Sequence, residues 1–130
     1  MLSKNQFVVL VLLSCVLWVA ATLYIRFLPT SLILPVSGSL AYVTTFPIAW
    51  LSVWLTKAVG RLSADQLLPG VAVVGAVAMM IDGVALRWFS GVFSPDDTTT
   101  RLGAAWLLWG YGVSFAIALI VARQLRRKTA

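Results

Sequence analysis

The chain has 130 residues, of which 61% are hydrophobic and only 11% are charged. A soluble domain carries about 25% charged residues, so most of the surface of this protein cannot face water. The net charge of +6 does not indicate a nucleic-acid partner, because the basic residues stand at the ends of apolar segments, where topology signals and lipid-headgroup contacts occur. The absence of histidine excludes the commonest metal ligand and general base.

Four uncharged runs occupy residues 5–25, 27–56, 66–81 and 102–122. A helix that spans a bilayer needs about 20 mostly apolar residues. The sequence therefore predicts an all-α polytopic integral membrane protein, an antiparallel bundle of four transmembrane helices in one domain. The expected spans cover about residues 6–28, 36–56, 67–89 and 102–122.

The first span begins after Lys4, as a secretion signal would. Its apolar run continues as far as Arg26, whereas a cleaved signal should give way to a polar mature start. We therefore expect an uncleaved helix that ends before Pro29. Pro29 and Pro35 predict an extended, apolar connection to the second span.

The second span contains Pro47, which frees the carbonyl of Val43 and predicts a bend. The hydroxyl of Thr44 is expected to compensate that carbonyl. The third span is preceded by Ser63 and Gln66, whose spacing is that of a capping box.

The fourth span follows the segment Ser94-Pro-Asp-Asp97. Serine before proline, followed by acids, predicts a helix with Ser94 as N-cap and Pro95 at its first position. Further along, Gly110, Ser114 and Ala118 are four residues apart, a spacing of small residues that lets helix backbones approach closely.

Lysine and arginine counts predict the orientation. With four spans, both termini and the loop at residues 57–66 share one side of the membrane, which then holds seven basic residues against three on the other side. The positive-inside rule places that side in the cytoplasm.

Asp82 is the acid that lies inside a predicted span. A charge in the middle of a bilayer costs about 2.5–3.5 kcal/mol on insertion scales, so we expect Asp82 to have a partner. Arg26, at the outer end of the first span, is the candidate. The favoured interpretation is a structural clamp between the first and third spans; the alternative is a proton, cation or polar-substrate site.

Polar side chains recur every four residues in the first span, at Ser14, Trp18, Thr22 and Arg26, and so share one helix face. This face could be a polar path, but such a stripe is more often turned towards neighbouring helices. The candidate helix-packing residues are Ser14, Trp18, Thr22, Gly75, Gly83, Gly110, Ser114 and Ala118.

The sequence offers no catalytic, cofactor-binding or metal-binding residues that we can assign. It has no glycine-rich phosphate loop, no paired cysteines, and no serine or cysteine nucleophile with a histidine base. We therefore predict that the protein is not an enzyme and needs no cofactor.

Two stretches carry a resemblance: Met80-Ile-Asp-Gly83 and Arg101-Leu-Gly-Ala-Ala-Trp-Leu-Leu-Trp-Gly-Tyr-Gly112. With four spans in a chain of this length, they resemble a bacterial family of small four-span membrane proteins of unknown function. The resemblance implies a bacterial inner-membrane setting and no particular activity. Small multidrug-resistance exporters share the size and span number, but they use a glutamate in the first helix, and this chain has no glutamate.

Two functions of different class follow from these observations. The first is a non-enzymatic interaction or accessory protein of the inner membrane, whose partners are the lipid bilayer and either another membrane protein or a second copy of itself. The second is a small transporter or channel in which Asp82 and Arg26 line a polar cavity. A hydrated surrounding of Asp82 would favour transport, and burial against a protein partner would favour interaction.

Overall fold

A computed structural model describes all residues from Met1 to Ala130, and it is entirely helical apart from turns. Four helices are long and apolar enough to cross a membrane. They are α1 (Lys4–Phe27), α3 (Pro35–Gly60), α4 (Ala64–Trp88) and α5 (Asp97–Thr129), joined by the short helix α2 (Thr30–Ile33) and the 3-10 turn η1 (Ser90–Val92).

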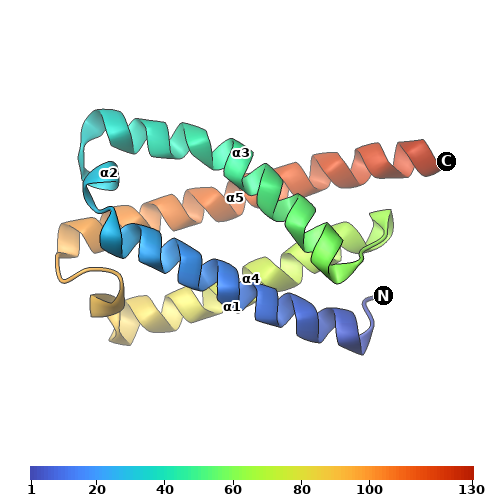
Figure 1. The fold of residues 1–130 in the computed structure, drawn as a ribbon, viewed down its shortest axis with the longest axis horizontal. Helices are drawn as coiled ribbons and strands as arrows, with labels where there is room; N and C mark the ends of the chain where they lie inside the picture. Colours follow the sequence, from blue (N-terminus) through green and yellow to red (C-terminus); the bar gives the residue numbers. More distant parts are fainter.

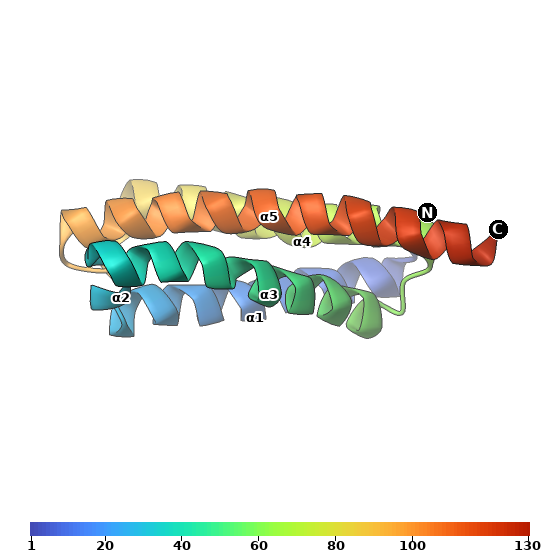
Figure 2. The same ribbon diagram turned by 90° about the horizontal axis from the view of Figure 1, so that it is seen from above.

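The four long helices form two layers. Figure 2 shows α1 and α3 side by side in one layer and α4 and α5 in the other. Each long helix runs against the direction of the one before it, so that both termini and the α3–α4 turn lie at one end (Figure 1). The short helix α2 and the loop before α5 lie at the opposite end.

The helix starts are fixed by short-range hydrogen bonds. Ser3 and Gln6 form a complete capping box at α1, with hydrogen bonds of 2.9 and 3.2 Å. At α4 the Gln66 side chain accepts a hydrogen bond of 3.1 Å from the backbone N–H of Ser63. This bond is one of the two that the predicted capping box requires, and it is confirmed. These bonds satisfy N–H groups that have no partner within the helix.

Two details at prolines differ from expectation. The connection after Pro29 is helical rather than extended, because Pro29 itself has helical backbone angles (φ −62°, ψ −34°) and proline is well suited to a first helical turn. In the turn before Pro47, the Thr44 hydroxyl donates to the carbonyl of Ala41 at 3.1 Å, not to that of Val43. A helical threonine reaches the carbonyl three or four residues back, and Val43 is only one residue away.

The start of α5 also differs from expectation. Asp96, not Ser94, is the N-cap: its carboxylate accepts hydrogen bonds of 2.8 Å from both the backbone N–H and the hydroxyl of Thr99. The Ser94 hydroxyl instead accepts a hydrogen bond from the N–H of Asp96. Pro95 therefore lies outside the helix.

The buried core is divided along the helix axes. A larger apolar cluster, which includes Leu10, Val53, Leu67 and Val121, lies towards the end with the termini. A smaller cluster around Ile25, Phe93 and Leu107 lies towards the opposite end. The polar residue Asp82 and an apolar cavity lie between these two clusters.

Candidate functional site

Asp82 is buried where three helices meet. Its side chain on α4 is only 5% exposed. One carboxylate oxygen accepts a hydrogen bond of 2.7 Å from Trp18 Nε1 on α1, and the other accepts a hydrogen bond from the Tyr111 hydroxyl on α5. The two donors join α1, α4 and α5 through one carboxyl group.

Arg26 is not the partner of Asp82. Its guanidinium donates to the carbonyls of Gly91 and Val92, at 2.8 and 3.1 Å, in the turn that follows α4. The physical reason is the register of the antiparallel pair α1 and α4. Trp18 lies level with Asp82, and Arg26 is eight residues further along, which is about 12 Å at the helical rise. The predicted intramembrane pair is therefore replaced by a Trp18–Asp82–Tyr111 cluster.

The polar face of α1 packs against α4. The Ser14 hydroxyl is fully buried and donates to the Val74 carbonyl at 2.7 Å. Thr22 is also buried, and its hydroxyl has no hydrogen-bond partner. Ser14, Trp18 and Arg26 each bond separately to α4 or to the turn after it. With Thr22 unpaired, the stripe contains no continuous chain of hydrogen bonds, which favours packing over a polar path.

The predicted small residues have different surroundings. A Cβ added at Gly75 would lie 2.7 Å from the Phe115 ring of α5, so this glycine permits close approach. Ala118 is completely buried. Gly110 is looser, since a Cβ there would lie 3.9 Å from Thr45. Gly83 faces outwards with nothing within 4 Å of an added Cβ, so within this chain it supports no packing.

Tyr111 and Gly103 are residues that the sequence analysis did not single out. Tyr111 belongs to a quoted motif, but no sequence signal indicates that it shares a level with Asp82. Gly103 allows Ile25 to approach α5, because an added Cβ would lie 3.0 Å from that side chain. In the sequence, Gly103 is a small residue four positions before Leu107, and this spacing only weakly indicates helix packing. The structure shows that Ile25 is the side chain that packs there.

A cavity of about 160 Å³ lies beside this cluster. Its walls come from all four long helices, and its aromatic lining consists of Trp18, Trp106, Tyr111 and Phe115. Asp82 does not line the cavity, whereas both of its hydrogen-bond donors, Trp18 and Tyr111, do. The cavity is therefore apolar even though an acid lies close behind two of its lining residues.

Most hydroxyl groups in the cavity wall already donate a hydrogen bond, and Ser114 is the exception. Thr45 donates to Ala41 O at 2.8 Å, Ser52 to Ile48 O at 2.9 Å, and Thr56 to Ser52 O at 2.8 Å. Each bond closes on the residue's own helix, as hydroxyls in apolar surroundings do. Elsewhere in the structure, no three His, Cys, Asp or Glu side chains gather at a distance suited to a metal ion.

The comparisons with known proteins give one match. The model of a family of unknown function, DUF5367, matches residues 27–125, which is most of the chain. No curated protein and no solved structure matches.

Proposed function

Since the chain belongs to the DUF5367 family, whose function is unknown, we propose its role from its own geometry. The protein is a four-span integral protein of a bacterial inner membrane, with both termini in the cytoplasm, and it acts by binding rather than by catalysis. Its partners are the lipid bilayer and another membrane protein or a second copy of the chain. The observation that carries this proposal is the closure of Asp82 onto two side chains of its own protein.

The apolar exterior supports the placement in lipid. Side chains on the outer faces of the helices are large, hydrophobic and exposed; Leu12, Leu51, Met80 and Leu108 are each more than 60% exposed. In water such a surface would far exceed the few hundred Å² of apolar patch that a soluble protein tolerates. A bilayer removes that cost, and the helices satisfy their own backbone groups.

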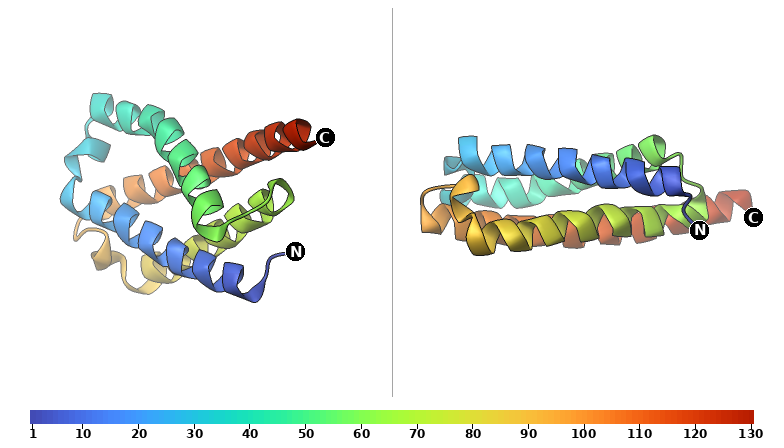
Figure 3. Two further views of the ribbon diagram at one scale, coloured as in Figure 1. Left: turned by 45° about the vertical axis from the view of Figure 1, so that its right-hand side comes forward. Right: turned by 90° about the horizontal axis from the view of Figure 1, so that it is seen from below.

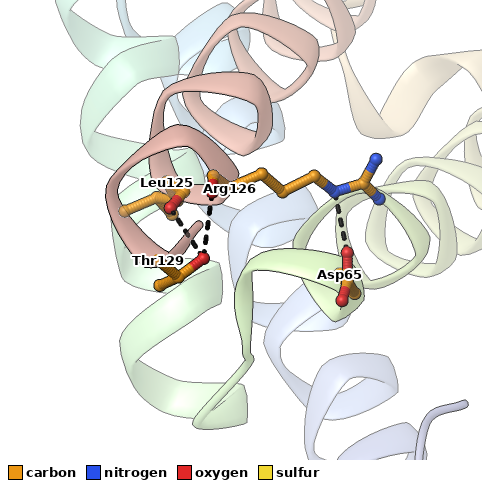
Figure 4. Close-up of polar contacts among 4 residues, drawn as sticks. All are labelled: Asp65, Leu125, Arg126 and Thr129. Atoms are coloured by element: carbon orange, nitrogen blue, oxygen red, sulfur yellow. Dashed lines mark hydrogen bonds and ion pairs between the residues drawn. The ribbon is translucent and has the colours of Figure 1, made fainter.

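The polar end of the molecule supports the orientation. Both termini and the α3–α4 turn lie at one end (Figure 3). There Arg126 Nε of α5 lies 2.7 Å from a carboxylate oxygen of Asp65 of α4, in an exposed ion pair between these two helices (Figure 4). Arg123, Arg127 and Lys128 lie in the same last stretch of α5. A cluster of basic residues at one end is typical of the cytoplasmic side.

The geometry of Asp82 favours interaction over transport. A proton or ion path would need the acid to face water or a chain of polar groups. Instead both carboxylate oxygens are occupied by Trp18 and Tyr111, and the neighbouring cavity is apolar. Arg26, the second group of the transporter alternative, bonds to backbone carbonyls away from Asp82.

The outward face of α4 supports a protein partner. Gly83 is exposed, and the space beside it is free. Small residues on an exposed face let a helix from outside approach closely. The partner helix would pack on the face of α4 that α1 and α5 leave uncovered.

Two experiments test the proposal. Alkaline phosphatase fused after Ala130 should be inactive and a fluorescent reporter at the same place should fluoresce; an active phosphatase would overturn the orientation.

Affinity purification in mild detergent, followed by mass spectrometry, should recover a stoichiometric partner or a dimer, and Gly83→Leu should reduce that recovery. Recovery of a lone monomer from both wild type and variant would overturn the interaction role.

A further inference from the structure

We propose that the cavity beside the Trp18–Asp82–Tyr111 cluster binds one acyl chain of a bilayer phospholipid. This proposal rests on the placement in a membrane proposed above and goes beyond it, because it assigns a specific hydrocarbon site inside the protein.

The cavity is long and runs along the helices. Its lining on α3 extends from Thr45 to Thr56, and its lining on α5 extends from Trp106 to Phe115. At 1.5 Å per residue these stretches cover about 16 and 14 Å. The α5 stretch is central in its helix and the α3 stretch lies mostly in the second half of its helix, so most of the cavity is at the depth of the hydrocarbon core. Its long axis is therefore parallel to the acyl chains of the surrounding lipid.

The chemistry of the wall selects hydrocarbon. Thirteen of the nineteen lining residues are hydrophobic. The hydroxyls of Thr45, Ser52 and Thr56 bond to their own helices, which leaves Ser114 as the one lining hydroxyl without a partner. An apolar cavity of about 150 Å³ in another protein stays dry and binds benzene, so the present cavity of about 160 Å³ favours an apolar occupant over water. Acyl chains are the apolar groups present in excess in a bilayer.

We place the opening of the cavity between α1 and α3, because residues of its lining on these two helices are exposed. These two helices diverge towards the end that carries α2 (Figure 1). Ile48, on the α3 side of the cavity, is 54% exposed, and Leu17 and Ala21 on the α1 side are partly exposed. The opposite wall is closed, because Ala78 is buried and Gly75 lies against Phe115. A chain can therefore enter from the side without passing through the polar end.

The proposal is tested by photo-crosslinking. The full-length protein is reconstituted into phosphatidylcholine bilayers that contain phosphatidylcholine with a diazirine in the middle of one acyl chain. After irradiation, the modified residues are mapped by mass spectrometry. We expect adducts on buried wall residues, Ala49, Val53 and Ala78, in addition to the exposed residues Leu51 and Met80 that any surrounding lipid reaches.

A matched pair of variants shows whether the chain occupies the cavity. Gly110→Leu adds a side chain that points into the cavity, since its Cβ makes only an ordinary contact of 3.9 Å with Thr45. Gly112→Leu makes the same change two residues away, where nothing lies within 4 Å and no cavity wall is involved. Gly110→Leu should lower the adducts at Ala78 about tenfold, the change expected when the burial of two methylene groups is lost.

The control variant, Gly112→Leu, should leave the adducts at Ala78 unchanged. Circular dichroism and gel filtration check that both variants fold, and Ser114→Met fills the same cavity if Gly110→Leu does not fold. Wild-type adducts confined to Leu51 and Met80, or equal adducts in both glycine variants, would overturn the acyl-chain site and leave the membrane placement standing. An absence of adducts at Leu51 and Met80 as well would overturn the membrane placement itself.

Discussion

Trp18 Nε1 and a carboxylate oxygen of Asp82 are 2.7 Å apart, and this hydrogen bond joins the middle of α1 to the second half of α4. Tyr111 completes the link from α5. A carboxyl group in apolar surroundings stabilises a structure only when its oxygens have partners, and it destabilises the structure when they are removed one at a time. This cluster therefore makes the packing of three helices depend on one residue.

The first prediction concerns Tyr111→Phe. The change leaves one Asp82 oxygen without a donor, so the free energy of unfolding in mixed micelles should fall by about 1 kcal/mol. The same change in an Asp82→Leu background should cost much less, because no carboxyl remains to be satisfied. Tyr42→Phe is the control, since the Tyr42 hydroxyl makes no hydrogen bond and only its backbone carbonyl accepts one, from Trp109. Equal losses in both backgrounds would contradict the cluster.

The second prediction concerns Arg26 and Asp82. Arg26→Gln removes hydrogen bonds to the carbonyls of Gly91 and Val92, and Asp82→Asn alters the cluster with Trp18 and Tyr111. Because the two residues share no partner, their effects on the free energy of unfolding should add to within about 0.5 kcal/mol. The measurement is a double-mutant cycle in detergent micelles. A larger coupling would restore the direct pairing that the sequence suggested.

The comparison of these two residues shows what a sequence can and cannot predict. The length and apolar character of a helix are local properties of the sequence. The uncharged runs therefore predict four long apolar helices, and the structure contains four helices of that kind. The partner of Asp82 depends on the register between α1 and α4, which is set by packing along both helices. A difference of two turns, from Arg26 to Trp18, is invisible in the sequence because both residues lie on the same face.

The cavity is a second feature that the sequence could not predict. Its wall is made of ordinary apolar residues, and no motif marks them. It lies where four helices meet, and the contacts between those helices are not local: Gly60 of α3 leaves room for Leu10 of α1 at one end, and α2 is inserted at the other. Such tertiary contacts decide which apolar faces meet and which remain open.

The third prediction uses two glycines in opposite surroundings. A Cβ at Gly38 would lie 2.9 Å from the backbone oxygen of Leu32, whereas a Cβ at Gly83 would meet nothing within 4 Å. Gly38→Ala should therefore lower the free energy of unfolding by about 1–3 kcal/mol, because the backbone of α2 must move. Gly83→Ala should raise it by up to about 1 kcal/mol through helix propensity. Unfolding in mixed micelles measures both, and changes of the same sign would contradict the contact with Leu32.

The fourth prediction concerns pH and the start of α5. The hydrogen bonds that Asp96 accepts from the Thr99 hydroxyl and backbone N–H hold the pKa of its carboxyl below the ordinary aspartate value. A group whose pKa is lower in the folded protein stabilises the fold above its unfolded pKa, and this contribution is lost as the pH falls through the folded pKa. The first turn of α5 should therefore fray only below about pH 4.

The amide resonance of Thr99, followed by NMR during an acid titration in micelles, measures this transition. Its midpoint should lie below the ordinary pKa of aspartate, which is about 3.9. Asp96→Asn is the matched control, because asparagine is an equally good N-cap but does not titrate, so the transition should disappear while Asp97 is still present. A midpoint at or above the ordinary value, or a transition that survives in Asp96→Asn, would show that Asp96 does not hold the helix start through its carboxylate.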